Sequence, residues 1–201
     1  MSRLTPELMA ICTGAAMSRA VASYNLAQEA ADLYGINTAN RMGMWLANIG
    51  HETAGLLYRE ELWGPTDAQK RYEGRKDLGN TQLGDGYRYR GRAWFQTTGR
   101  ANYLRLTQRL RGRWPQMQVP DFVEEPDMLA QIQWAAVSAA DYHEMRGLNR
   151  FADTGDFDGY CDTVNIGRKT STEGDSNGWK HRLALWTAAR PALILAGFAT
   201  P

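Results

Sequence analysis

"INTANRMGMWLANIGHETA", residues 36–54, carries the clearest helical pattern in the chain. Thr38 is a residue type preferred at helix N-caps, where its side chain can satisfy a free backbone N–H. Four apolar side chains then recur at the spacing i, i+3, i+4 and i+7: Met42, Trp45, Leu46 and Ile49. This spacing places them on one face of a helix, so we expect a buried helix that organises the core.

Other helical patterns occupy most of the remaining chain. We expect helices over residues 5–16, 18–33, 100–112, 126–146, 156–165 and 177–190, with one or two further turns in "RPALILAGF". Residues 64–92 differ, because they are rich in Gly, Asp and Asn and show little periodicity. We expect a long irregular segment there, with at most a small β-hairpin. The sequence therefore predicts a mainly α domain with a long irregular central segment.

Length and composition are those of a globular protein. The 201 residues suffice for one domain, and hydrophobic and charged fractions of 43% and 22% are ordinary. No stretch approaches the ~18 consecutive apolar residues of a membrane-spanning helix. Thr5 and Pro6 indicate a helix start rather than a signal peptide, so we expect cytoplasmic synthesis without an export signal. Cys12 and Cys161 are too few for a disulfide scaffold, and we expect both to be buried.

The small net charge of +1 is distributed unevenly along the chain. Residues 71–113 contain eleven Lys or Arg and three Asp or Glu, a local charge of +8. Such a segment can attract an acidic polymer or an anionic surface, and a solvated helix face is the ordinary alternative. No nucleic-acid-binding motif accompanies the charge, so we expect no nucleic-acid partner.

Two acidic sites follow the core helix. Glu52 lies three residues after Ile49, so it falls on the same apolar face. A carboxyl group packed against apolar side chains loses hydration, which raises its pKa and suits it to act as a general acid. Glu61 lies beyond Gly55 in a more polar stretch, where a carboxylate can stay ionised and act as a base. Such a pair is typical of glycoside hydrolysis. Glu60 is an alternative base, and a surface role for these glutamates also stays open.

"HETAG" at residues 51–55 also invites comparison with the zinc-protease motif. That motif requires a second His at its fifth position, one helical turn after the first, where this chain has Gly55. We therefore expect no metal and no cofactor. His51 is better suited to hydrogen bonding near the helix end, where it can support Glu52.

Three stretches together carry a family resemblance. They are "HETAGLLYREEL" at residues 51–62, "RYEGRKDLGN" at 71–80 and "GDGYRYRGRAWFQTTGRANY" at 84–103. They resemble glycoside hydrolase family 19, and more closely the single-domain bacteriophage endolysins of that family, over about residues 38–190. The resemblance implies a lysozyme-like helical fold with a cleft between two lobes. It also implies cleavage of β-1,4 bonds between N-acetylated sugars, with inversion at the anomeric carbon.

The resemblance assigns roles to particular positions. It implies that Glu52 protonates the leaving oxygen, that Glu61, nine residues later, activates water, and that the Thr98 hydroxyl holds this water. It places Gln96 and Asn102 in the sugar site and Asn165 at the N-acetyl group.

Other side chains are candidates for substrate binding on their own chemistry. His51, Tyr72 and Arg75 complete this set, with Arg75 placed to orient Glu61 or to meet acidic groups of a substrate. Four aromatic residues offer stacking faces for sugar rings or, equally, core packing: Trp63, Tyr72, Tyr87 and Tyr89. Arg88, Arg90 and Arg92 are candidates for the same two roles as Arg75, and for most of these four a solvated role is the main alternative.

The chain departs from the family pattern at several positions. Ala93 stands where the family usually has glycine, Trp94 replaces a smaller residue, and Thr97 replaces an apolar one. The "NIGRK" turn at residues 165–169 also lacks the second glycine of the family's Asn-Gly-Gly. These departures concern the shape of the sugar subsites rather than the acid and base.

The leading hypothesis is an endolysin that cleaves the glycan strand of peptidoglycan. The carboxylates of peptidoglycan, which chitin lacks, would give the basic segment 71–113 a binding partner. Export of the enzyme to the wall would depend on a separate pore-forming protein. We expect residues 1–201 to form a single, monomeric glycoside hydrolase domain without a separate cell-wall-binding module. A chitinase acting on chitin oligomers and a non-catalytic wall-binding protein on the same scaffold are the alternatives.

Overall fold

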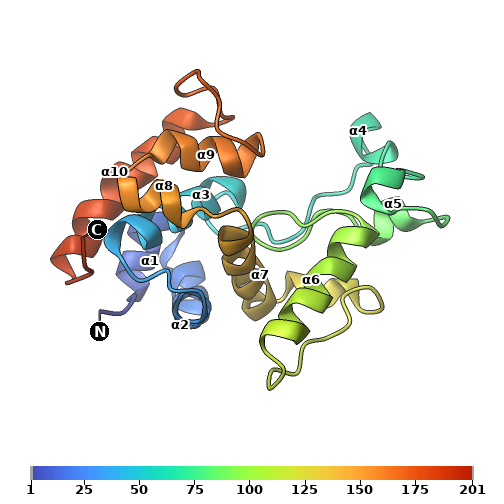
Figure 1. Cartoon of the computed structure of the whole chain (residues 1–201), viewed down its shortest axis with the longest axis horizontal. Helices are drawn as coiled ribbons and strands as arrows, with labels where there is room; N and C mark the ends of the chain where they lie inside the picture. Colours follow the sequence, from blue (N-terminus) through green and yellow to red (C-terminus); the bar gives the residue numbers. More distant parts are fainter. Residues whose placement is uncertain (1, 201) are drawn as a thin grey trace. The chain divides into compact units, whose positions relative to one another are not determined.

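The computed structural model describes residues 2–200 and is mainly helical (Figure 1). Its helices, two of them 3-10 helices (η), are α1 (Pro6–Thr13), α2 (Met17–Leu33), α3 (Ala39–Glu52), α4 (Asp67–Lys70), η1 (Lys76–Leu78), α5 (Asp85–Arg88), α6 (Arg100–Arg113), η2 (Pro126–Ala130), α7 (Ile132–Met145), α8 (Asn149–Thr154), α9 (Phe157–Asn165) and α10 (Trp179–Leu195). Within residues 2–200, β structure is limited to isolated bridges. The predicted mainly α fold is confirmed. Residues 2–200 contain no β-hairpin, which the sequence had allowed but not required.

The chain divides into two compact units. One, the discontinuous unit, contains residues 2–58 and 139–200, and the other, the central unit, contains residues 59–138. The first predicted acidic residue, Glu52, belongs to the discontinuous unit, whereas Glu61 belongs to the central unit. The surroundings of each carboxylate therefore come from a different unit.

Helix α3 is the core of the discontinuous unit, where it lies among α1, α8, α9 and α10 (Figure 1). The Thr38 side chain caps its start by accepting a hydrogen bond from Arg41 N at 3.2 Å, and the four predicted apolar residues are fully buried. Two glycines allow neighbouring elements to approach closely. A methyl group at residue 43 would lie 2.5 Å from the Trp186 ring of α10, and one at residue 50 would lie 2.3 Å from Thr13 O of α1.

Several predicted helices differ in extent. The pattern over 126–146 divides into η2 and α7, because Gln131 between them has extended backbone with ψ 141°. The last pattern becomes one helix, α10, which continues through the exposed Pro191. Both cysteines are buried and free, as expected, and burial raises the pKa of each thiol to about 12. No helix within residues 2–200 has the length and apolar character needed to cross a membrane.

The central unit replaces the predicted irregular segment with short helices held by polar contacts. The Thr66 and Gln69 side chains form a reciprocal cap at the start of α4. The Arg100 guanidinium binds Asp85 at the start of α5 and holds the pKa of that carboxyl below its usual range. These short helices depend on a local cap and on a side chain 15 positions away rather than on an apolar face, so periodicity alone did not reveal them.

Candidate active site

Glu61 accepts three hydrogen bonds from uncharged donors of the central unit. Gln69 Nε2 and the Tyr72 hydroxyl lie 3.0 and 3.4 Å from Glu61 Oε1, and Gly91 N lies 3.1 Å from Oε2. Burial, followed by the charge of Glu61 itself, raises the pKa of Tyr72, so the phenol remains a hydrogen-bond donor. The carboxylate is thus fixed in orientation without a cation.

Gln69 is saturated with hydrogen bonds, which fixes the direction of its amide. Its Nε2 group also donates to Leu62 O at 2.7 Å, while Oε1 accepts from Gly64 N at 3.2 Å and Thr66 N at 2.7 Å. Both amide protons and both acceptor positions of this buried side chain are therefore used. The NH2 group must face Glu61.

Gly91 brings two other predicted residues to Glu61. A methyl group at position 91 would lie 2.4 Å from Gln96 Oε1 and 3.3 Å from Thr98 Oγ1, so both side chains lie directly against this glycine. The Thr98 hydroxyl donates to Gln96 O at 2.9 Å, and Asn102 Nδ2 donates to Thr98 O at 2.6 Å. Glu61, Gln96, Thr98 and Asn102 therefore form one connected group around Gly91.

Arg75 lies at the edge of this group. It is exposed and forms an ion pair with Asp77, and its positive charge acts on Tyr72, lowering the pKa of that phenol against the larger effect of burial. No hydrogen bond joins Arg75 to Glu61 in the described residues. The roles expected for Arg75, in orienting Glu61 or in meeting acidic groups of a substrate, stay predictions.

The four aromatic candidates separate into two kinds. Tyr89 is fully buried and packs edge-on against Tyr103, so it belongs to the core. Trp63 contacts Tyr72 and Tyr87, with ring centroids 6.2 and 5.3 Å apart. Because Tyr87 is 52% exposed and Tyr72 also bonds to Glu61, these three rings form an accessible aromatic cluster beside the carboxylate.

Glu60 has different surroundings from Glu61. It forms ion pairs with Arg90 and Arg92, and Arg92 is almost fully buried and also binds Asp127 at 2.6 Å. A solvated role for Arg92 is therefore wrong, and its position indicates a structural function. Glu61, by contrast, faces the group around Gly91.

Glu52 is the last residue of α3, in the discontinuous unit. The apolar face on which Glu52 was expected also includes a cation, because Glu52 Oε1 pairs with the guanidinium of Arg182 from α10. The Arg182 side chain is almost fully buried and also donates to Asn48 Oδ1 at 2.6 Å and to Asn177 O at 2.9 Å. Three partners fix this cation, so it holds one oxygen of the Glu52 carboxyl in place.

His51 and Asn165 both contact the C-terminal segment that holds Arg182. His51 Nδ1 lies 3.0 Å from His181 Nδ1, and a methyl group at Gly178 would lie 1.9 Å from the His51 ring. Burial, reinforced by the charge of Arg182, lowers the pKa of His51, so the imidazole is neutral near pH 7. Asn165 Oδ1 accepts from Asn177 N at 2.8 Å. The segment that holds Arg182 thus also fixes these two residues.

Sequence reasoning missed several supporting residues: Asn48, Gln69, Gly91, His181 and Arg182. Gln69 had a local signal, because Thr66 and Gln69 have the spacing of a capping box. Arg182 had none, because it is 130 positions from Glu52.

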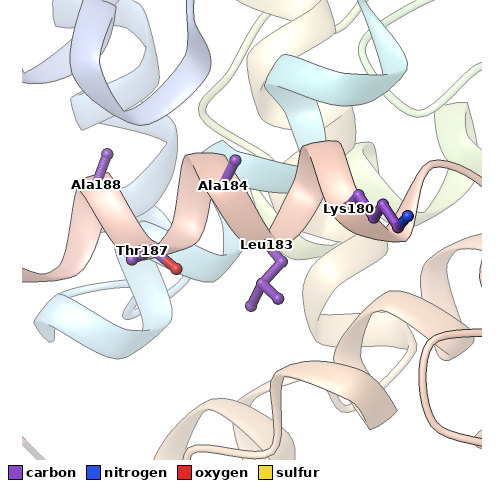
Figure 2. Close-up of a pocket in the computed structure, with 5 residues that line it drawn as sticks. All are labelled: Lys180, Leu183, Ala184, Thr187 and Ala188. Atoms are coloured by element: carbon purple, nitrogen blue, oxygen red, sulfur yellow. The ribbon is translucent and has the colours of Figure 1, made fainter.

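A hollow of about 490 Å³ lies along the outer face of α10 (Figure 2). It is lined by Lys180, Leu183, Ala184, Thr187 and Ala188, all from that helix. None of the predicted site residues lines it, and its only ionisable side chain is Lys180. This hollow is therefore separate from the candidate catalytic groups.

No known protein family matches the chain by its sequence profile. Among solved structures, chitinase C from Streptomyces griseus matches it with a TM-score of 0.67 and 16% identity, over 98% of this chain and 77% of the chitinase. A mutant of that chitinase, in which glutamine replaces a glutamate, matches with a TM-score of 0.66 and 15% identity over the same shares. At these identities, the similarity shows a shared, mainly helical fold and nothing beyond it.

Proposed function

We propose that this chain is a glycoside hydrolase that cleaves β-1,4 bonds of an N-acetylated glycan by an inverting mechanism. The observation that carries the proposal is the group around Gly91, in which the Glu61 carboxylate, the Thr98 hydroxyl and the Gln96 amide lie together. Such a group supplies a base, a hydroxyl that can position water and an amide for a sugar. The chitinase-like fold supports this assignment.

In the proposed mechanism, Glu61 removes a proton from water while Thr98 holds that water, and Glu52 donates a proton to the leaving oxygen. Inverting enzymes separate their two carboxyl groups by ~6.5–9.5 Å, which leaves room for the water. Arg182 binds Oε1 of Glu52. In this mechanism the proton would be donated from Oε2, the oxygen that Arg182 does not bind.

We propose the glycan strand of peptidoglycan as the substrate and an endolysin as the biological role. In residues 71–113, several arginines form ion pairs, but Arg71, Lys76 and Arg105 are exposed and have no acidic partner among the described residues. A positive surface attracts the carboxylates of peptidoglycan, which chitin lacks. Release to the wall would require a separate pore-forming protein.

Chitin oligomers are the second candidate substrate, because the two matching solved structures described above are chitinases. The two substrates can be separated by incubating the protein with purified sacculi and with soluble chitin oligomers. Release of fragments from chitin alone would favour the chitinase, whereas release from sacculi would favour the endolysin.

The test of the mechanism compares wild type with Glu52→Gln and Glu61→Gln in the clearing of outer-membrane-stripped bacterial cells. Glutamine keeps the size of the side chain but cannot exchange the proton, so each change should lower the rate by about 10²–10⁴-fold. Proton NMR of the first products should show the inverted anomer.

Glu60→Gln is the matched control. It removes a partner of the buried Arg92, so we expect lower stability, by about 1–3 kcal/mol, with clearing activity retained. If Glu61→Gln remained active while Glu60→Gln did not, the base would have to be reassigned. If wild type released nothing from either glycan, the non-catalytic binding protein would replace the enzyme.

A further inference from the structure

A second polar region of the discontinuous unit lies between α9 and α10. Two buried oxygens there lack hydrogen-bond partners: Asp162 Oδ1, in a residue that is 0% exposed, and Ser176 Oγ, in a residue that is 3% exposed. Few buried polar atoms of a folded protein lack partners, and an ion or water is a common explanation. Across residues 2–200 only three other side-chain atoms share this condition, and two of those, Glu60 Oε1 and Arg92 Nε, lie 3.0 Å from each other.

Asp162 faces a second carboxyl group. Thr170 N donates to Asp162 Oδ2 at 2.9 Å, while the Thr170 hydroxyl donates to Asp175 Oδ2, also at 2.9 Å. Thr170 thus links the two carboxyl groups, and the negative charge of Asp175 acts on Asp162. A buried carboxylate beside another carboxylate is unfavourable unless a cation or a shared proton joins them.

The nearby lysine does not supply that charge by direct pairing. Lys169 Nζ pairs with Asp156, and Asp158 Oδ1 is occupied by Gly174 N at 2.7 Å. Residues 156–178 carry five acidic and two basic side chains, so the segment is negative overall. Residues 162–178 contain neither His nor Cys, and their available side-chain ligands are mostly oxygens. Oxygen ligands of this kind suit a hard divalent cation.

We propose that Asp162 and Asp175 bind a calcium ion, with Thr170, Ser176 and carbonyl oxygens of the loop completing its shell. Within residues 2–200, no three His, Cys, Asp or Glu side chains gather into a metal site, so neutral oxygens must supply the remaining ligands. Ca²⁺ accepts such mixed and irregular oxygen shells, whereas Mg²⁺ demands near-octahedral geometry.

The proposed ion has a structural consequence for Glu52. The loop ends at Asn177, whose N–H binds Asn165 and whose carbonyl binds the Arg182 guanidinium. Arg182 in turn binds Glu52. Calcium would therefore order the segment that holds the partner of Glu52. The site itself stands independently of the proposed enzyme activity, because its ligands are outside the catalytic group.

The test uses the whole chain, stripped of metal with EDTA and then titrated with CaCl2. With a Kd on the order of 0.1–1 mM, a hundredfold excess of Ca²⁺ should raise Tm by roughly 5–10 °C. MgCl2 should give a smaller shift. Tb³⁺ should bind in place of Ca²⁺ and emit on excitation of Trp179, whose ring packs against Gly174, and added Ca²⁺ should quench that emission.

Asp162→Asn and the exposed Asp175→Asn should each abolish the calcium-dependent rise in Tm and the Tb³⁺ emission. If Asp162→Asn does not fold, Asp175→Asn alone tests whether the carboxylates are needed for calcium binding. Asp32→Asn, a half-exposed acid on α2, is the control and should keep both signals. The proposal is overturned if wild type shows no calcium-dependent shift, or if acidification alone raises Tm and Asp162→Asn reproduces that rise. In that case a shared proton, rather than an ion, joins the two carboxyl groups.

Discussion

Glu60 and Glu61 are adjacent in sequence, yet their side chains have opposite surroundings. Glu60 forms an antiparallel bridge with Arg92, so the backbone here is extended. Successive side chains of extended backbone point to opposite sides. Glu60 therefore meets the guanidinium groups of Arg90 and Arg92, while Glu61 meets Gln69, Tyr72 and Gly91. Glu60 is therefore an ion-paired structural residue, whereas its neighbour Glu61 is the candidate base.

Gly91→Ala should impair activity more than folding. The added methyl group would lie 2.4 Å from Gln96 Oε1, so the amide must move away from Glu61 and Thr98. Displacements near 1 Å can reduce rates by ~10²-fold, and we expect a loss of at least about tenfold in clearing rate. Gly112→Ala is the control, because the exposed face of α6 leaves open space around it. Equal activity of both variants would contradict the packing of Gln96 over Gly91.

Among single residues, the sequence indicated the candidate site residues better than the side chains that contact them. Glu61, Gln96, Thr98 and Asn102 form one connected group, and all but Glu61 fall within the single stretch 91–102. The catalytic and binding roles that the resemblance implied for them stay predictions. The surroundings of Glu52 were not predictable from local spacing. Its neighbour Arg182 comes from a helix far along the chain, and the apolar face of α3 gives no sign of this guanidinium.

Helices with a long apolar stripe were predictable, and short ones were not. The patterns for α1, α2, α3, α6 and α9 are confirmed to within a few residues. Helices α4, α5 and α8 have only four to six residues, too few for a recurring apolar face. They depend instead on caps and on distant side chains, such as the Arg100–Asp85 pair.

Ala93→Gly should stabilise the turn that precedes the Gln96–Thr98 stretch. Ala93 is fully buried and has φ 68°, a left-handed conformation that disfavours every residue with a Cβ. Relief of this strain, partly offset by the greater freedom of glycine when unfolded, should raise stability by about 0.5–1 kcal/mol. Chemical denaturation would measure it.

Ala184→Gly provides the comparison for this prediction. Ala184 is exposed within α10, where glycine should lower stability by about 1 kcal/mol. If both changes destabilised the protein equally, the backbone at position 93 would not be strained by alanine. Ala93 would then be retained for its buried methyl group.

For the whole molecule, acid should weaken the discontinuous unit through His143. The ring joins three helices: Nε2 donates to Asn149 Oδ1 at 2.7 Å, and Nδ1 accepts from the Tyr160 hydroxyl at 2.8 Å. Burial lowers the pKa of His143 from 6.5 to about 4. Since the unfolded state binds the proton first, stability should fall as pH drops from about 6.5 to 4, by about 3 kcal/mol.

Unfolding in urea at pH 7 and pH 4.5 would measure this loss. His143→Gln removes the titrating group and should flatten the dependence over the same interval, although its starting stability is lower. NMR of the imidazole should show that His143 stays neutral at pH 5. A protonated ring at that pH, with the fold intact, would contradict the prediction.

The discontinuous unit consists of two sequence segments, so its second segment is synthesised only after the whole central unit. The central unit is one continuous stretch, 59–138, and all of it leaves the ribosome before α10 has been translated. Helix α3 cannot complete its burial until then, because Gly43 packs against Trp186 and Glu52 against Arg182. A nascent chain therefore carries the core helix α3 without α10 through most of translation. Premature termination before residue 179 leaves that helix permanently without its main cover.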